Sequence, residues 1–335
     1  MPRRRLSERQ IARIERIQER RRSRLEARTE AVLDGLDEAT PQPGRIMVRH
    51  GANLAVEDDR GHLHHCVSRR NIGHPVCGDR VVWQATGDGT GIVTALLPRG
   101  TVLSRPDYAG RDKPLAANIS LMLIVVAPQP APTGYLIDQY LVTAELIGIG
   151  ALLLCNKMDL LDAAGRDAFL GGLEHYDAIG YPLVPLSVKQ DPRVHALLAR
   201  IGGETAILLG QSGVGKSSLV KALLPDQDIQ IGRLSRATGL GRHTTSASTC
   251  YRLGSGGALI DSPGVRSFRL RALDRGDLER GFREFAPHLG RCRFADCRHQ
   301  QEPDCALRQA VADGVVAARR LESFHLLAGE LERAG

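Results

Sequence analysis

The stretch Gly210-Gln211-Ser212-Gly213-Val214-Gly215-Lys216-Ser217 matches the phosphate-binding pattern G-x-x-x-x-G-K-[ST] at every fixed position. A second motif, Asn156-Lys157-Met158-Asp159, lies upstream of it. In an ordinary guanine-nucleotide domain, Asn-Lys-x-Asp lies downstream of the phosphate loop. The two motifs therefore co-occur by coincidence, or they belong to one domain whose strand order has been rotated.

The segments around both motifs predict a parallel α/β sheet. Strand and helix patterns alternate from about residue 115 to 224, which is typical of this class. An apolar run over 151–155 predicts a strand that ends at Asn156, and 205–209 predicts the strand that leads into the phosphate loop. Open α/β sheets bind ligands at the carboxyl ends of their strands. This placement favours a real nucleotide site over a chance match.

The phosphate loop predicts how a triphosphate is held. Its glycines let backbone N–H groups surround the phosphates, Lys216 places an ammonium on their oxygens, and the Ser217 hydroxyl ligates Mg²⁺. The residues that we expect to bind GTP are Asn156, Lys157, Met158, Asp159, Ser187, Gly210, Gln211, Ser212, Gly213, Val214, Gly215, Lys216, Ser217, Ser218 and Asp261.

The upstream motif predicts guanine specificity. The Asp159 carboxylate can accept both N1–H and N2–H of guanine, a pair that adenine does not offer. Asn156 is placed to read the O6/N7 edge, and the Lys157 stem packs under the base. We expect Ser187 to tie this loop together. The four residues also fit a plain helix cap, and that alternative stays open from the sequence alone.

Two further segments predict a γ-phosphate sensor. Asp261-Ser-Pro-Gly264 follows an apolar strand, so Asp261 is expected to hold the Mg²⁺ shell through water and Gly264 to offer its N–H. In the segment 241–245, Thr244 or Thr245 is expected to ligate Mg²⁺ while GTP is bound. The sequence does not choose between the two threonines.

The catalytic candidates are Lys216, His243, Thr244, Thr245 and Gly264. Val265 stands where many GTPases have a glutamine that orients water, so we expect slow intrinsic hydrolysis. His243 is the nearby polar residue that can position water. The alternative is a loop histidine that only contacts RNA or solvent.

A Cys-Cys-His-Cys set predicts a metal site near the C-terminus. Cys292, Cys297, His299 and Cys305 offer a full tetrahedral shell, which suits a structural Zn²⁺. The alternative is a set of free thiols. After the set, 306–332 predicts one long helix.

The N-terminal third predicts contacts with a polyanion. Residues 1–30 hold eleven Arg, no Lys and five Glu, so most of the net charge of +7 lies there. The alternative is a solvated tail. Short strands with glycine-rich turns follow up to about residue 97 and predict an oligonucleotide-binding (OB-type) β-barrel. The same region carries the cluster His62, His64, His65 and Cys66. These residues could bind a metal, but a solvated or RNA-facing strand is the better interpretation.

Composition narrows the class of protein. The seven cysteines are scattered except for the last three, which argues against a disulfide framework. No apolar run approaches the ~20 residues of a membrane span. We expect a soluble, cytoplasmic, monomeric protein with no membrane contact.

Taken together, the motifs resemble the bacterial ribosome-small-subunit-dependent GTPase A family. The marks are Gly78-Asp-Arg-Val-Val-Trp83, Leu103-Ser-Arg-Pro106, the segments 156–159, 210–218, 241–245 and 261–264, and the Cys-Cys-His-Cys spacing. The resemblance implies a multidomain α/β protein with an OB-type barrel, a circularly permuted P-loop GTPase domain and a C-terminal helical zinc domain. We expect an arginine-rich arm over 1–42, the barrel over 43–103, the GTPase domain over 104–270 and the zinc domain over 271–335.

The same resemblance implies a role in late maturation of the small (30S) ribosomal subunit. Its expected partners are that subunit, its 16S rRNA and GTP or GDP, and its cofactors Zn²⁺ and Mg²⁺ with GTP. The subunit is expected to stimulate hydrolysis. Two alternatives are an RNA-binding scaffold with a structural nucleotide and a GTPase that acts on another RNA.

Overall fold

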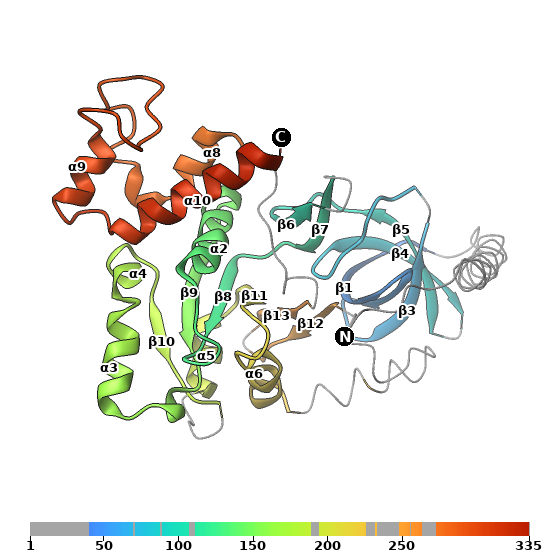
Figure 1. Ribbon diagram of the computed structural model, residues 1–335. Helices are drawn as coiled ribbons and strands as arrows, with labels where there is room; N and C mark the ends of the chain where they lie inside the picture. Colours follow the sequence, from blue (N-terminus) through green and yellow to red (C-terminus); the bar gives the residue numbers. More distant parts are fainter. Residues whose placement is uncertain are drawn as a thin grey trace, which may run out of the picture.

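The computed structural model describes residues 40–69, 71–87, 89–106, 111–188, 194–225, 232, 248–254, 256–262 and 273–334. Figure 1 shows a small barrel, a sheet flanked by helices and a C-terminal helical unit. Nearly all of the arginine-rich arm lies outside the described residues, as do His243, Thr244, Thr245, Gly264 and Val265. Within the described ranges, no helix has the length and hydropathy that crossing a bilayer requires.

Five strands form the barrel that the sequence predicts. They are β1 (Gln42–His50), β2 (Asn53–Glu57), β3 (Leu63–Ser68), β4 (Arg80–Gly87) and β5 (Thr90–Leu96). β1 pairs with both β2 and β4, which closes the barrel, and β3 pairs with β5 in parallel. Inward-facing side chains pack around Trp83, whose indole N–H donates to Pro43 O at 3.2 Å. The OB-type barrel is confirmed.

The central sheet has the parallel α/β arrangement that the sequence predicts. Its order is β10 (Leu183–Pro185), β9 (Gly150–Cys155), β8 (Leu121–Val126), β11 (Thr205–Leu209), β13 (Ala258–Asp261) and β12 (Ser248–Arg252). Neighbouring strands are parallel except for β12, which pairs antiparallel with β13. Strand β8 lies between β9 and β11, so the ends of the two motif-bearing strands are separated by one strand only.

Helices cover both faces of this sheet because successive side chains of a strand point to opposite sides. On one face Ile124 and its neighbours pack against α2 (Gly134–Ile147) and α4 (Glu174–Ala178). On the other face Leu123 and Val125 pack against α5 (Val194–Ile201) and α6 (Lys216–Leu223). The fully apolar pattern of β8 is the consequence of burial on both sides.

The barrel and the sheet are joined by backbone pairing. Val48 and Arg49 of β1 pair with Thr249 and Ser248 of β12, which makes one sheet of eleven strands. Gly78 is part of this junction: its φ is +89°, and a Cβ there would lie 2.1 Å from Ala117 O. Only glycine allows the barrel to approach the main chain so closely at this point.

Asp79 and a hairpin complete the junction. The Asp79 carboxylate is fully buried and accepts two hydrogen bonds from Arg99, at 2.7 and 2.8 Å. The hairpin consists of β6 (Val102–Pro106) and β7 (Asp112–Ala117), and it links the barrel to β8. Gly78 therefore lies directly against β7, and the Asp79–Arg99 pair fixes the barrel segments beside that contact.

The C-terminal unit differs from the prediction of one helix over 306–332. The structure has α9 (Ala306–Ala312) and α10 (Ala318–Ala334), preceded by α8 (Arg275–Arg280) and a 3-10 turn, η4 (Arg283–Phe285). The break follows from Gly314, whose φ of +74° is left-handed and ends the first helix. Between β9 and β10 the chain likewise forms two helices, α3 (Ala163–Gly171) and α4, because the pair Gly171-Gly172 has low helix propensity.

A buried ion network fixes the C-terminal unit to α2. Arg320 of α10 is 1% exposed, and its guanidinium lies 2.6 Å from Asp138 Oδ1 of α2 and 2.6 Å from Glu284 Oε1. Burial raises the pKa of the Asp138 carboxyl, and the neighbouring Arg320 acts against that shift. The Tyr176 hydroxyl donates to the same Asp138 oxygen at 2.8 Å. These hydrogen bonds and ion pairs connect α10, η4, α4 and α2 in one buried network.

Replacing Arg320 with leucine should strongly destabilise the packing of α10 against the rest of the protein. Removal of one partner from a buried ion pair leaves uncompensated charge and costs about 3–5 kcal/mol. We expect Arg320→Leu to lower the opening free energy of α10 by about that amount in hydrogen exchange. The control is Arg319→Leu, an exposed neighbour whose one hydrogen bond to Gly172 O contributes about 1 kcal/mol. Equal effects of the two substitutions would contradict a structural role for the network.

Candidate functional site

The phosphate loop runs from Gly210 to Gly215, between β11 and α6. Gly210 has a φ of +132°, and a Cβ there would lie 2.3 Å from Val125 O of the neighbouring strand. Helix α6 begins at Lys216, so its unpaired N–H groups point into the loop. A helix N-terminus after a glycine-rich turn is a ready site for phosphate.

Lys216 lies inside the curve of the loop. Its side chain is 8% exposed, and Nζ donates to Gly210 O at 2.7 Å and to Gln211 O at 2.6 Å. The ammonium is therefore held against two carbonyls of the loop. This places one positive charge where the phosphate-binding pattern requires it.

Asn156 connects the upstream motif to the phosphate loop. Its side chain is 2% exposed, and Nδ2 donates to Val214 O at 2.8 Å. Its Oδ1 accepts from the backbone N–H of Val188 at 3.4 Å. The approach is close enough that a Cβ on Gly215 would lie 2.3 Å from Asn156 Nδ2. Two motifs 50 residues apart in the chain thus form one site.

The rest of the upstream motif forms a short, tied loop. Lys157 has a left-handed φ of +62°, and its Nζ donates to Gln129 O at 2.8 Å. Met158 is buried, and its N–H donates to Leu186 O. Asp159 accepts a hydrogen bond from the Ser187 hydroxyl, which connects the loops after β9 and β10. Ser187 and Asp159 thus lie next to each other at the ends of neighbouring strands.

Asp261 lies at the carboxyl end of β13, which is the neighbour of β11, the strand that leads into the phosphate loop. A contact that the motif pattern did not reveal follows it: Ser262 Oγ lies 2.8 Å from Ser248 Oγ of β12, and Ser262 is 3% exposed. The sequence assigned no role to Ser262, which lies between Asp261 and Gly264, and nothing in it singled out Ser248. The pair ties the Asp261 segment to the strand that joins the barrel.

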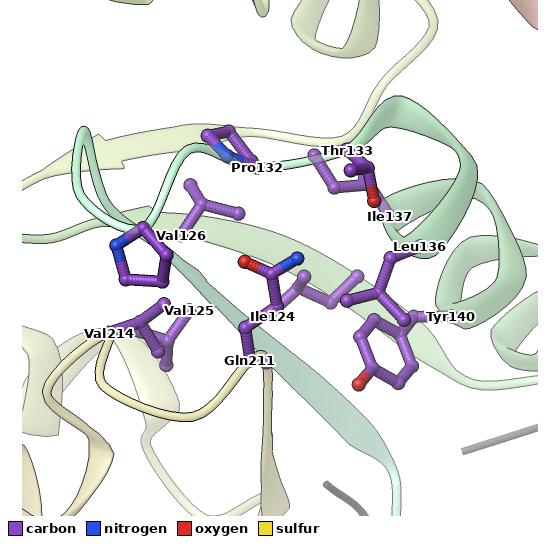
Figure 2. Close-up of a pocket in the computed structure, with 12 residues that line it drawn as sticks. Ile124, Val125, Val126, Pro132, Thr133, Leu136, Ile137, Tyr140, Gln211 and Val214 are labelled. Atoms are coloured by element: carbon purple, nitrogen blue, oxygen red, sulfur yellow. The ribbon is translucent and has the colours of Figure 1, made fainter. Parts of the chain in front are cut away.

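A small apolar pocket lies beside the phosphate loop, toward α2 (Figure 2). Leu136 and Tyr140 of α2 point toward Ile124 and Gln211, and the space holds about one water molecule. Burial raises the pKa of Tyr140 to about 12, and its hydroxyl accepts a hydrogen bond from the Gly210 N–H. The pocket is too small for a base and is part of the packing between α2 and the loop.

The C-terminal set forms one cluster. The ligand atoms of Cys292, Cys297, His299 and Cys305 all lie within 4.8 Å of one another, and all but Cys292 are buried. The backbone N–H of Arg308 and the His299 ring hold the pKa of the Cys305 thiol below its usual value, although burial acts in the opposite direction. Three cysteine sulfurs grouped with an imidazole are the donor chemistry of a metal site. The residues present therefore fit a bound metal ion.

The histidines of the barrel do not form a second cluster. His64 Nε2 lies 2.9 Å from Asp58 Oδ2, and its ring packs on Trp83 with centroids 4.4 Å apart. His65 Nε2 lies 3.1 Å from Asn53 Oδ1, and Cys66 is buried in the barrel core. Among the residues that the structure describes, only the Cys292 set is grouped for a metal.

Comparison with known proteins agrees with this geometry. A family model described as RsgA GTPase matches residues 96–271. A Pseudomonas aeruginosa protein named small ribosomal subunit biogenesis GTPase RsgA is 44% identical over 332 residues, with 98% of each chain covered. A Chromohalobacter salexigens protein of the same name is 47% identical over 337 residues, covering 98% of this chain and 99% of the relative.

The chain belongs to the RsgA GTPase family. It is therefore a GTP-hydrolysing enzyme, and the resemblance that its motifs showed is confirmed. Among solved structures, YjeQ from Thermotoga maritima has a TM-score of 0.70 at 28% identity, covering 87% of this chain and 99% of that one. YloQ, described as a circularly permuted GTPase, has a TM-score of 0.68 at 27% identity, covering 88% and 96%. The rotated strand order of the RsgA fold is thus confirmed as well.

Gly215→Ala should weaken GTP binding more than Gly213→Ala. Both glycines have a left-handed φ, +102° and +87°, so both substitutions strain the backbone by about 1–2 kcal/mol. Only a Cβ at 215 displaces the Asn156 amide, because the nearest atom to a Cβ at 213 is 3.7 Å away. Breaking that buried hydrogen bond costs about 1–3 kcal/mol more. By titration, we expect the Kd for a GTP analogue to be at least about fivefold higher in Gly215→Ala than in Gly213→Ala. Equal Kd values in the two variants would contradict the role of Asn156.

Proposed function

We propose that this chain is a GTP-hydrolysing assembly factor that acts in late maturation of the small (30S) ribosomal subunit. The observation that carries the proposal is the match over 98% of the chain to relatives named small ribosomal subunit biogenesis GTPase RsgA, at 44 and 47% identity. The hydrogen bond between Asn156 and Val214 supports it, because it brings the guanine motif to the phosphate loop. GTP favours the RNA-bound state, and hydrolysis releases the factor.

The proposed nucleotide contacts follow the site geometry. Asp159 accepts from guanine N1–H and N2–H, while the second hydrogen of Asn156 Nδ2 remains to meet the base. Lys216 turns its ammonium from the loop carbonyls to the β- and γ-phosphate oxygens. Ser217 ligates Mg²⁺, and Asp261 holds the Mg²⁺ shell through water.

The proposed chemistry also uses residues outside the described ranges. Thr244 or Thr245 completes the Mg²⁺ shell, and the Gly264 N–H contacts the γ-phosphate. His243 positions the attacking water, since Val265 has no hydrogen-bonding group for it. Intrinsic turnover is therefore slow, and a partner that brings these groups onto the γ-phosphate accelerates it.

The proposed RNA contacts lie on the arm, the barrel and the C-terminal unit. Around the metal cluster, four arginine side chains are exposed: Arg291, Arg293, Arg298 and Arg308. Arg293 lies over the ring of Phe294 at 5.6 Å, and Phe294 is 42% exposed. Exposed cations beside an aromatic face are typical of contacts with single-stranded RNA. We assign 16S rRNA as the polyanion.

The proposed metal is Zn²⁺. Three sulfurs and one imidazole form a soft, tetrahedral set, which selects Zn²⁺ over Mg²⁺ or Ca²⁺. All four positions are filled by side chains, so the site is structural and leaves no place for a catalytic water.

Purified small subunits should accelerate GTP hydrolysis by at least about tenfold. Lys216→Ala should lose both the basal and the stimulated rate, because the phosphate charge is no longer neutralised. His243→Ala should lose only the stimulation and keep GTP affinity near the wild-type value. GTP hydrolysis with and without subunits measures the rates, and titration with a GTP analogue measures the affinity of His243→Ala. No stimulation by small subunits, or stimulation by an unrelated RNA to the same extent, would overturn the proposal.

A further inference from the structure

A carboxylate faces the side of the metal-binding imidazole that is turned away from the thiols. His299 Nδ1 lies 3.3 Å from Cys305 Sγ and 3.6 Å from Cys292 Sγ. The other ring nitrogen, Nε2, lies 3.4 Å from Glu279 Oε1. The His299 side chain is 5% exposed and that of Glu279 is 19% exposed, so water competes little for this contact.

The backbone that carries His299 is fixed independently of Glu279. His299 has a left-handed φ of +60°, which few residues other than glycine adopt. The Glu302 carboxylate holds this turn by accepting from the N–H groups of Arg298, Gln300 and Gln301, at 2.8, 2.9 and 3.1 Å. The His299 carbonyl oxygen lies 3.0 Å from His325 Nε2. Because the main chain is held in this way, the carboxylate next to Nε2 determines which ring nitrogen carries the proton and how the ring is oriented.

A neutral imidazole has one nitrogen that donates and one that accepts. A metal ion requires the lone pair of Nδ1, and that lone pair is available only when the proton is on Nε2. A carboxylate beside Nε2 stabilises this tautomer and makes Nδ1 a stronger donor.

We propose that Glu279 is a positioning residue of the metal centre, which holds the Nε2 proton of His299 so that Nδ1 faces the metal. The inference deepens the proposed zinc site and rests on it. Glu279 belongs to α8, whereas all four ligands lie in the segment 292–305. Arg275 of the same helix supports the arrangement, since its Nε lies 3.3 Å from Glu279 Oε1 and its Nη2 donates to Arg298 O.

This contact also links the metal loop to the GTPase domain. Helix α8 packs against α2, and Leu278 of α8 and Val142 of α2 belong to the same buried cluster as Cys297 and Cys305. Glu279 therefore ties a ligand of the loop to a helix that is itself fixed on the central domain. Metal binding clamps the loop onto α8 through His299.

The test is the affinity of the full chain for Zn²⁺, measured by competition with a chromophoric chelator. The Zn²⁺ content of the wild type is determined first, because a wild type without stoichiometric metal would overturn both the zinc site and this inference. With metal present, we expect Glu279→Gln to raise the Kd for Zn²⁺ by about 10- to 100-fold. The matched control is Asp277→Asn, which removes the carboxylate that pairs with Arg280 on the same helix. We expect no change in the control, and an equal change in both variants would overturn the inference.

A second comparison separates positioning from general damage to α8. His299→Cys replaces the imidazole with a fourth thiolate, which also forms a Zn²⁺ shell and has no ring to orient. If Glu279 acts through His299, Glu279→Gln has no further effect on Zn²⁺ affinity in the His299→Cys background. An undiminished effect in that background would show that Glu279 acts on the helix alone and would overturn the inference.

Discussion

The side-chain amide of Asn156 connects three loops of the nucleotide site. It donates to Val214 O in the phosphate loop and accepts from the Val188 N–H in the loop after β10. Because the amide is almost fully buried, its loss would leave a carbonyl and an N–H without partners, at about 1–3 kcal/mol each. The arrangement depends on β8, which sets the spacing between the strand before Asn156 and the strand before Gly210. The pocket is therefore determined by which strands are neighbours in the sheet, and not by the order of the strands along the chain.

The rotation of the chain also determines how the other parts are attached. The barrel precedes the permuted domain, yet it pairs through β1 with β12, a strand next to the Asp261 segment. The C-terminal unit follows that segment and is fixed to α2 by Arg320. Helix α2 in turn contacts the phosphate loop through the Tyr140 hydroxyl and the Gly210 N–H. Both flanking parts thus contact elements that border the nucleotide site.

Fixed motifs singled out the candidate site residues, whereas some of the elements around them differ from the prediction. Motif residues such as Lys216 and Asp159 were found because their chemistry requires fixed letters at fixed spacing. The Cys-Cys-His-Cys set was singled out for the same reason, and its four side chains lie together in the structure. The pairing of β12 with the barrel was not found, since only two residues of each strand meet there. The break at Gly314 was missed because one glycine in an otherwise helical pattern is ambiguous until its φ is known. Contacts such as Ser248 with Ser262 depend on tertiary packing and have no periodic signal in the chain.

The central claim is that Asp159 and Lys216 serve one nucleotide in spite of their reversed order, and base preference tests it most directly. Xanthine carries an oxygen where guanine carries its amino group, so Asp159→Asn exchanges an acceptor for a donor at that edge. We expect the Kd for GTP to rise at least about tenfold, as one lost charge-assisted hydrogen bond contributes about 1.5–3 kcal/mol, and xanthosine triphosphate to bind better than GTP. The exposed Asp167, changed to asparagine, is the control. Unchanged GTP affinity in Asp159→Asn would contradict the account, since the guanine motif would then lie outside the pocket.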